Sequence, residues 1–398
     1  MNDLKLGSRV RYSLLAMFLV MGISSMSWIP RIPEIKYSLG LSDGQFGLLL
    51  ASSSVGSVIG AQISGDLIHR FGSKNVLRVS QIVMPLGIFV MGAFLSVPGL
   101  LIGLFLMGFG YAAMDIAANS QAVVAEKLAQ KKFLASLHGA WSIGTFGTAL
   151  IGAFFASFLT PQWNLIGMAI IAPLIFVPLT ELLLPKERDE HIGEKGSKVK
   201  LPWFGGKVSI LWLFAFGSLG SFVAEGASMD WGGILLAEHM DVPFGLTATV
   251  FASFAAAMII SRFTADRFME KHGAYVTVKY IGMAGAIAWA AGIWAGVLLH
   301  ESQPIVAMIL VNAGFFAAGL AIGPMFPAFI AGAASIEGVP PSLAIARIGV
   351  ISIAGYFIGP TITGFISEVT SLPIALLYPA AALLVAGYLG NVLKPQKK

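Results

Sequence analysis

The sequence contains no cysteine, and only 11% of its 398 residues are charged. The absence of cysteine excludes disulfide bonds and thiolate metal sites, and it leaves the redox compartment undetermined. An ordinary soluble domain carries about 25% charged residues, because its surface must face water. Here 57% of the residues are hydrophobic, which is too many for a soluble protein of this size to bury. The sequence therefore predicts a protein embedded in a lipid bilayer.

Other features are also missing. The sequence shows no nucleotide-binding glycine loop and no cluster of histidines or cysteines, and we expect no appended soluble domain. These absences argue against an ATP-driven pump, a membrane sensor and a membrane enzyme. The net charge of +5 comes from basic residues that lie between apolar runs and do not alternate with aromatic residues, which argues against a nucleic-acid partner. We expect no enzymatic activity, no cofactor and no bound metal.

Long apolar runs are what the sequence has in abundance. A membrane-spanning helix needs roughly 20 mostly apolar residues. The expected helices cover residues 11–33, 44–69, 75–96, 98–124, 134–158, 163–184, 208–236, 246–270, 275–298, 303–334, 342–368 and 373–393. Basic residues precede the first run and no small-residue cleavage site follows it, so this run is expected to remain as an uncleaved helix.

One long charged segment, residues 185–207, divides these runs into six and six. We therefore expect an all-α membrane protein with twelve transmembrane helices in two six-helix bundles. The first bundle covers residues 1–184 and the second covers residues 208–398, with 185–207 as the linker loop.

Lysine and arginine residues are distributed unevenly between the two sides of the expected membrane. If the N-terminus is cytoplasmic, 22 of the 25 basic residues fall on the cytoplasmic side. The opposite side carries only Arg31 and Lys36, and Arg347 lies inside a helix. Short cytoplasmic loops are enriched in basic residues. The sequence thus predicts a multi-pass protein of a bacterial inner membrane with both termini and the linker in the cytoplasm.

Short motifs recur in the two halves in the same order and at nearly constant separation. Residues 25–28 (SMSW) recur at 228–231 (SMDW), 69–72 (HRFG) at 270–273 (EKHG), 108–112 (GFGYA) at 314–318 (GFFAA), and 139–143 (GAWSI) at 349–353 (GVISI). Duplicated halves of this kind place a substrate site between them near the membrane midplane. We expect the two bundles to be pseudo-symmetric.

The segment from Gly65 to Lys74 (GDLIHRFGSK) resembles the signature of the major facilitator superfamily between helices 2 and 3. His69 occupies the place of an acidic residue in that signature, and the neighbouring Asp66 is an acid that could replace it. The resemblance implies that this loop makes charge contacts that change during alternating access. The residues assigned to this gating-loop motif are Gly65, Asp66, His69, Arg70, Gly72 and Lys74.

A second resemblance is confined to helix 4. Residues 114–119 (MDIAAN) are similar to a segment of fucose-type sugar–proton symporters. Residues 27–33, 138–145 and 224–231 look like the MosC-like and YbjJ-like bacterial group of the same superfamily. The glycine–proline pair that marks helix 5 of drug–proton antiporters is absent. These resemblances imply a secondary transporter, and they favour symport over drug export.

Charged residues inside a membrane span are costly and commonly functional. Asp115 lies about two-thirds along helix 4, far from any lysine or arginine in sequence, and Asn119 is one turn later on the same face. Apolar surroundings favour the neutral form of a carboxyl group, which suits a reversible proton carrier. Asp115 and Glu225 of helix 7 are therefore the expected proton-coupling residues. The alternative is an acid held by a structural hydrogen bond.

The expected substrate-binding residues share polarity or aromatic character inside a span, and each has a structural alternative. Arg31 and Arg347 could extend outward to the membrane interface, and Asp230 could end in the outer headgroup region. Trp28 and Trp231 are expected in the interfacial aromatic belt rather than against a sugar ring. The residues assigned to substrate binding are Arg31, Asn119, Trp141, Asp230 and Arg347.

Taken together, these features predict a monomeric, proton-coupled symporter for a small polar solute such as a sugar, a polyol or a related metabolite. Its partners would be that solute, protons and the lipid bilayer. The alternative is a proton-exchanging exporter of metabolites or drugs.

Overall fold

The computed structural model describes residues 3–156, 158–188, 209–336, 339 and 341–394, and every regular element in these ranges is a helix. The chain forms two compact units. Unit 1 consists of Met1–Gly40 and Leu49–Ser197, and unit 2 of Leu41–Leu48 and Lys198–Lys398. Most of the predicted linker, from residue 189 onward, lies outside the described residues.

The helices of the first half follow the predicted runs, with an earlier start. They are α1 (Asp3–Ser25), η1 (Ile29–Arg31), α2 (Ile32–Ser38), α3 (Asp43–Phe71), α4 (Ser73–Ala93), α5 (Val97–Ala129), α6 (Leu134–Ala156) and α7 (Pro161–Glu181), followed by η2 (Lys186–Arg188). The first predicted helix, 11–33, therefore begins at Asp3 and ends at Ser25. The rest of that run forms a short 3-10 segment and α2, and a proline occupies the first turn of each.

The helices of the second half contain more interruptions. They are α8 (Leu211–His239), α9 (Phe244–His272), α10 (Ala274–Val276), the π-helical segment η4 (Thr277–Ile281), α11 (Gly282–Leu299), α12 (Pro304–Ile322), α13 (Met325–Ala334), α14 (Pro341–Val369), α15 (Leu372–Ala375), α16 (Leu377–Leu389) and η5 (Gly390–Leu393). The single helix predicted over 303–334 is thus divided at Gly323 and Pro324. Proline removes a backbone donor and crowds the preceding turn, which explains the division.

Eleven helical stretches of the described chain are long and apolar enough to cross a membrane. The one predicted run that is not among these eleven is 208–236. It corresponds to α8, which has 29 residues. Serine, glycine, Glu225 and Asp230 lower its hydropathy. Most of its side chains are buried against α9, α14 and α16, so it has less need of a lipid-facing apolar surface. The all-helical, twelve-helix membrane fold predicted from the sequence is confirmed.

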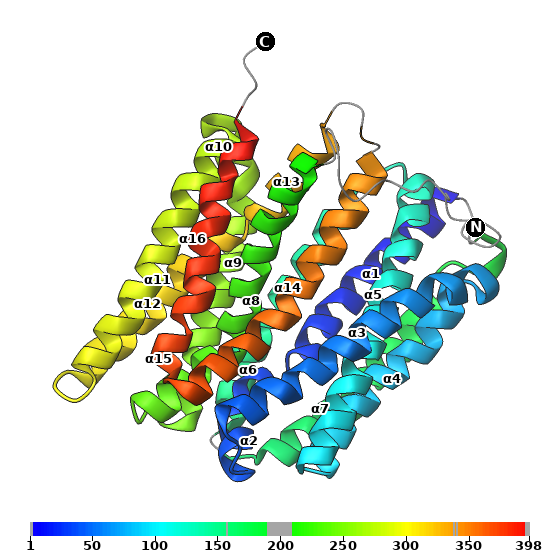
Figure 1. Ribbon diagram of the computed structural model, residues 1–398. Helices are drawn as coiled ribbons and strands as arrows, with labels where there is room; N and C mark the ends of the chain where they lie inside the picture. The colour runs from blue at the N-terminus through cyan, green and yellow to red at the C-terminus, as the bar shows by residue number, and fades with distance from the viewer. Residues whose placement is uncertain (1–2, 157, 189–208, 337–338, 340, 395–398) are drawn as a thin grey trace. The chain divides into compact units, whose positions relative to one another are not determined.

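The same helix pairs pack in both units (Figure 1). In unit 1, α4 packs on α5 and α7, and α1 packs on α5, α6 and α7. In unit 2, α11 packs on α12 and α16, and α8 packs on α12, α14 and α16. The corresponding helices occupy the same order along the chain, as expected of a duplicated six-helix bundle.

Two glycines at equivalent positions of the duplicated halves have nearly the same backbone dihedral angles. Gly72 precedes α4 with φ 86° and ψ 150°, and Gly273 precedes α10 with φ 84° and ψ 147°. Positive φ favours glycine, which has no Cβ atom. Both belong to the second pair of recurring motifs, so the repeat seen in the sequence encodes the same tight turn twice.

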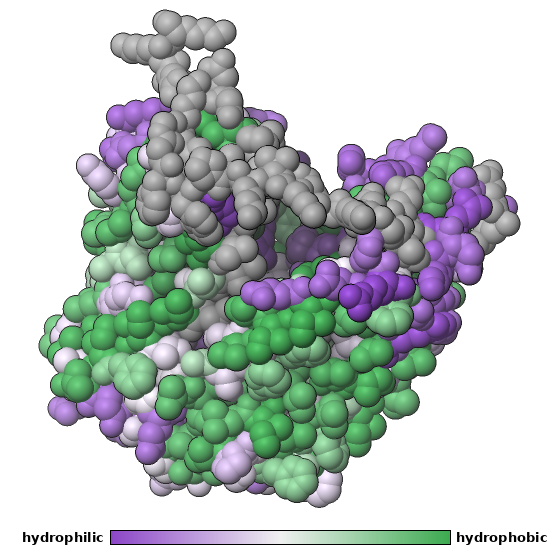
Figure 2. All heavy atoms as spheres, turned by 45° about the vertical axis from the view of Figure 1, so that its right-hand side comes forward, coloured by the Kyte–Doolittle hydropathy of each residue, from purple (hydrophilic) through white to green (hydrophobic). Residues whose placement is uncertain are grey.

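The exterior of the bundles is apolar. On the face shown in Figure 2, hydrophobic residues cover most of the surface and hydrophilic residues gather mainly toward one end. Many large hydrophobic side chains are exposed, among them Leu174, Leu298, Ile305 and Val369. Exposed apolar surface of this extent is typical of a protein that faces lipid.

Candidate functional site

Asp115 and Asn119 lie together on α5 of unit 1, as the sequence predicts. Both side chains are partly buried, and the Asn119 side-chain amide donates a hydrogen bond to the Asp115 backbone carbonyl at 2.9 Å. Among the described residues, no basic side chain forms an ion pair with Asp115. A carboxyl group without a counter-charge in a spanning helix is most stable when it is neutral.

Several polar atoms of the same unit are buried without a hydrogen-bond partner in the described residues. Two of them are Oδ1 of Asn119 and Nε1 of Trp141 on α6. Buried polar groups are nearly always satisfied, so each exception calls for an explanation. An acceptor and a donor left open in the interior are suited to a polar ligand. α1 packs against both α5 and α6, and the Trp141 Nε1 atom makes no hydrogen bond to Asp115 or Asn119 in the described residues.

Arg31 occupies a different part of unit 1. Its side chain is 0% exposed, its Nη2 atom lies 3.2 Å from Oε2 of Glu34, and the same nitrogen donates to the backbone carbonyl of Leu159. It is therefore enclosed by the protein and held at the connection between α6 and α7. Its Nε and Nη1 atoms, and Oε1 of Glu34, remain buried without a partner.

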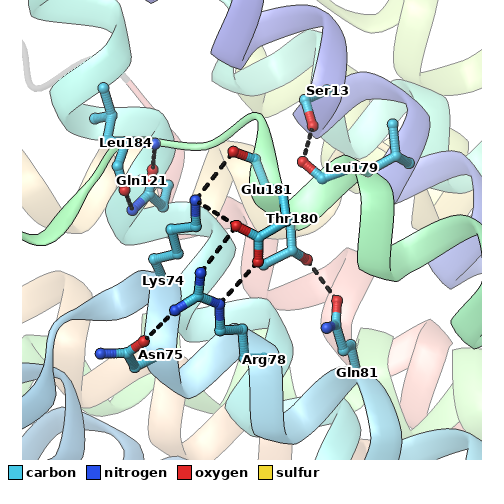
Figure 3. A network of polar contacts seen from close by, with 10 residues as sticks. All are labelled: Ser13, Lys74, Asn75, Arg78, Gln81, Gln121, Leu179, Thr180, Glu181 and Leu184. Carbon is cyan, nitrogen blue, oxygen red and sulfur yellow. Dashed lines mark hydrogen bonds and ion pairs between the residues drawn. The ribbon is translucent and has the colours of Figure 1, made fainter.

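Lys74 of the gating-loop motif and Arg78, one turn after it on α4, make charge contacts inside unit 1 (Figure 3). Arg78 binds the carboxylate of Glu181 at the end of α7 through Nε at 2.9 Å and Nη2 at 2.8 Å. Lys74 lies 3.2 Å from the same carboxylate and donates to the Glu181 backbone carbonyl at 3.0 Å. Among the other motif residues, Gly65, Asp66 and Arg70 are exposed, and Nδ1 of His69 is buried without a partner.

Glu181 is the acidic residue that the sequence reasoning missed. Asp66 was the candidate to replace the missing acid of the motif, and the described residues contain no ion pair of Asp66. The available signal was a single acid at the end of the sixth apolar run, directly before the linker. A buried amide completes the network: Gln121 of α5 donates to Ser73 Oγ at 2.7 Å and accepts from Leu184 N at 2.9 Å.

Unit 2 contains a second intramembrane acid with a basic partner. Oε1 of Glu225, halfway along α8, lies 3.7 Å from Nη2 of Arg262 on α9. The Glu225 side chain is 8% exposed and the Arg262 side chain is 34% exposed. Arg262 is one of the 22 basic residues predicted on the cytoplasmic side, and its guanidinium group lies against a residue in the middle of α8.

The other predicted residues of unit 2 lie elsewhere on α8 and on α14. Asp230 is partly exposed and lies five residues after Glu225, about 140° around the helix. Arg347 is partly buried in the second turn of α14. Trp231 is fully buried, and its Nε1 donates to the Pro360 carbonyl at 3.0 Å.

The interfacial belt predicted for Trp28 and Trp231 is wrong, because Trp28 is only 4% exposed and Trp231 is fully buried. In unit 2, the Trp231 ring meets Phe46 edge-on, with the ring centroids 5.5 Å apart. Both indoles therefore serve packing inside the protein.

Comparison with known proteins agrees with the motif resemblance. The family model described as Major Facilitator Superfamily matches residues 14–338. An uncharacterized MFS-type transporter of Yersinia pestis is 25% identical over 92% of this chain and 91% of its own length. Membrane protein MosC of Rhizobium meliloti is 28% identical over 91% of this chain and 84% of its own length.

Two solved structures share the fold. A mutant of the nucleoside transporter NupG has a TM-score of 0.78 at 13% identity and covers 97% of this chain and 100% of its own. A D-xylose-proton symporter has a TM-score of 0.74 at 14% identity and covers 98% of both chains.

Proposed function

We propose that this chain, which belongs to the Major Facilitator Superfamily, is a proton-coupled symporter of a small polar solute, with Asp115 carrying the coupling proton. The observation that supports the proposal is the Asp115–Asn119 pair on α5, where an acid without a basic partner adjoins an amide oxygen left open in the interior. A structural neighbour named as a D-xylose-proton symporter has the same fold, so proton symport is chemistry that this fold can perform.

The proposed cycle follows from the cost of a buried charge. When Asp115 is ionised, a closure that excludes water from its surroundings leaves a buried carboxylate without a counter-charge. This state has a high free energy. When Asp115 is protonated, that cost disappears, and the carboxyl group can itself donate a hydrogen bond. Closure with bound solute is therefore favoured by the protonated form. Asn119 Oδ1 and Trp141 Nε1 supply an acceptor and a donor for the solute.

The Asp115→Asn variant mimics the protonated form and tests this role. We expect it to abolish uphill accumulation under an imposed pH gradient, because no proton can be released. Solute exchange at equal pH should persist. Both activities are measured in proteoliposomes, with a radiolabelled solute first identified by thermal-shift screening of sugars, polyols, nucleosides and organic acids.

Asp241→Asn is the matched control, because it makes the same change at an exposed connection between α8 and α9. Asn tolerates the positive φ of 51° at that position, so transport should equal that of the parent. Accumulation by Asp115→Asn at the parental level would contradict the proposed role. If solute accumulated in the vesicles when the imposed proton gradient was directed out of them, the protein would instead be a proton-exchanging exporter.

A further inference from the structure

The charge contact at the start of α4 has a counterpart in unit 2. Arg78 lies six residues after the positive-φ glycine of unit 1, and Lys279 lies six residues after that of unit 2. Each basic side chain contacts the end of the last helix of its own unit. Arg78 donates to the Glu181 carboxylate at 2.8 Å. Lys279 Nζ donates to Oδ1 of Asn391 at 3.1 Å, so unit 2 has a neutral amide where unit 1 has a carboxylate.

Two lysine ammonium groups gather at this position of unit 2. Lys279 Nζ lies 5.4 Å from the centroid of the Tyr275 ring, and Lys394 Nζ lies 5.0 Å from the same centroid. Neither lysine forms an ion pair with an acidic side chain in the part of the chain that the structure describes. Of the three N–H donors of Lys279, one bonds Asn391 and a second bonds the Tyr275 hydroxyl oxygen at 3.3 Å. Within the described residues, two positive charges therefore lie together without a carboxylate.

The π-helical segment Thr277–Ile281 shapes an aromatic face around these charges. Residues five apart lie about 140° apart around an α-helix, so Tyr275 and Tyr280 would diverge in one. A π-helix closes its hydrogen bonds over five residues and brings such residues toward the same side. The two rings accordingly lie 6.1 Å apart, and Lys279 Nζ lies 5.4 and 5.5 Å from their centroids. The π-helical segment therefore places two tyrosine rings beside one ammonium group.

The end of the last helix closes the other side of this arrangement. η5 packs against both α10 and η4, and Figure 1 shows α10 beside these last turns of the described chain. Gly390 permits the approach, because a Cβ atom there would lie 3.1 Å from the Lys279 backbone nitrogen. Asn391 is held in place, because its Nδ2 donates to the Tyr388 carbonyl at 2.7 Å. The four side chains that make up the resulting lysine–tyrosine cluster are Tyr275, Lys279, Tyr280 and Lys394.

The lysine–tyrosine cluster lies where an apolar span begins. The span Ala274–Leu299 starts one residue before Tyr275. Exposed apolar side chains continue from the cluster along the two helices that lead away from it, with Ile287 on α11 and Val385 on α16, and these helices pack on each other. Tyrosine and lysine at the end of a span are typical of the headgroup level of a membrane. The exposed apolar residues below them are suited to acyl chains.

We propose that the lysine–tyrosine cluster binds the phosphate of an anionic membrane lipid, whose acyl chains lie along α11 and α16. The phosphate supplies the negative charge that Glu181 supplies in unit 1. Lysine ammonium groups donate strong hydrogen bonds to phosphate oxygens, and basic pockets beside spanning helices bind anionic headgroups. A water-soluble phosphate would make no use of the exposed apolar residues beside the cluster. The site includes none of the residues of the proposed transport cycle, so it does not depend on proton symport.

Lipid titration of the purified full-length protein in mild detergent tests the proposal. The probes are phosphatidylglycerol, which carries one negative charge, and phosphatidylcholine with the same acyl chains, which has no net charge. Native mass spectrometry counts the bound lipids, and thermal unfolding measures their stabilising effect. We expect phosphatidylglycerol to bind and to raise the unfolding temperature, and phosphatidylcholine to bind at least about tenfold more weakly. Glycerol phosphate and inorganic phosphate, which lack acyl chains, should leave the unfolding temperature unchanged at the same concentrations.

Removal of both ammonium groups tests the cluster itself. Lys279→Gln combined with Lys394→Gln should lower the affinity for phosphatidylglycerol at least about tenfold. Lys131→Gln combined with Lys271→Gln is the matched control, because it removes two exposed lysines outside the cluster and gives the same net charge. The control should bind phosphatidylglycerol as the parent does. An equal loss in both double variants would show that net charge alone attracts the lipid, and would overturn the proposal.

Asn391→Asp tests the comparison with unit 1. The new carboxylate would pair with Lys279 as Glu181 pairs with Arg78, so the lipid-free variant should unfold at a higher temperature than the parent. Its affinity for phosphatidylglycerol should fall about two- to fivefold, the range expected for one exposed ion pair. Asn391→Gln stays neutral and should keep the parental affinity. Equal binding of the two lipids, inorganic phosphate that stabilises the protein as phosphatidylglycerol does, or unchanged lipid affinity in Asn391→Asp would overturn the proposal.

Discussion

At the residue scale, the contacts around the start of α4 combine an exposed charge cluster with a buried amide. Glu181 and Arg78 are about half exposed, so water and salt screen their attraction. Gln121 is 1% exposed and binds both Ser73 and the Leu184 backbone. A buried hydrogen-bond partner costs more to remove than an exposed ion pair, because the groups left behind cannot turn to water.

This difference predicts which of two substitutions destabilises the protein more. We expect Gln121→Leu to lower the free energy of unfolding by about 1–3 kcal/mol, because the Leu184 amide loses its acceptor. Glu181→Gln should lower it by less than about 1 kcal/mol. Denaturant titrations in mixed micelles at low and high salt distinguish the two. Only the Glu181→Gln effect should shrink in 1 M salt, and a Gln121→Leu effect that disappeared with salt would contradict this account.

Neighbouring residues could be predicted from the sequence where both lie on one helix, and not where they lie on two. The position of Asn119 one turn after Asp115 on the same face follows from helical spacing alone, and the hydrogen bond from the Asn119 amide to the Asp115 backbone carbonyl agrees with it. The pairing of Glu225 with Arg262 depends on which helices are neighbours and how each is rotated. The burial of Trp231 depends on tertiary packing in the same way, which is why the interfacial belt was the wrong expectation.

At the element scale, the division between α12 and α13 has a specific chemical compensation. Pro324 has no backbone N–H, so the carbonyl of Leu320 four residues earlier lacks its helical donor. Ser261 of α9 supplies one, through a hydrogen bond from Oγ to Leu320 O at 2.7 Å. Gly323 permits this approach, because a Cβ atom at that position would collide with the Ser261 side chain.

A double-mutant cycle tests the compensation. Ser261→Ala should destabilise the protein by about 1–3 kcal/mol, because the Leu320 carbonyl loses the donor that replaces the missing N–H of Pro324. In a Pro324→Ala background, residue 324 regains an N–H that can bond Leu320 O along the helix. The same Ser261→Ala change should then cost close to nothing. Equal costs in both backgrounds, measured by thermal unfolding, would show that Ser261 does not serve Leu320.

Most elements could be predicted because a spanning helix is encoded by composition over a long window. The twelve predicted runs all correspond to helices of the described chain. The interruptions within the helices were missed, because each depends on local contacts of a few residues and leaves the composition of the long window unchanged. Gly323–Pro324 was readable as a break but was passed over within an apolar run, and the π-helical segment Thr277–Ile281 has no sequence signal that we recognise.

At the scale of the whole molecule, the duplication and the charge bias constrain the topology together. Six helices in each unit return the chain to the side from which it started. The N-terminus, the linker and the C-terminus should therefore face the same compartment. Of the 25 basic residues, 22 were assigned to that side; Arg262 now lies against Glu225, and its removal from the count leaves the bias almost unchanged. A bias of this size sets orientation during insertion, because basic loops are retained in the cytoplasm.

Reporter fusions in a bacterial inner membrane test this orientation. Alkaline phosphatase, which is active only in the periplasm, should be inactive when fused after Lys398 or within 189–207, and active when inserted at Ser302 between α11 and α12. A fluorescent protein that matures only in the cytoplasm should show the opposite pattern at the same sites. The two reporters control for each other, because a fusion that is merely degraded is silent in both. Phosphatase activity at Lys398 with fluorescence at Ser302 would mean an inverted protein, and the solute and proton movements proposed above would then run in the opposite direction across the membrane.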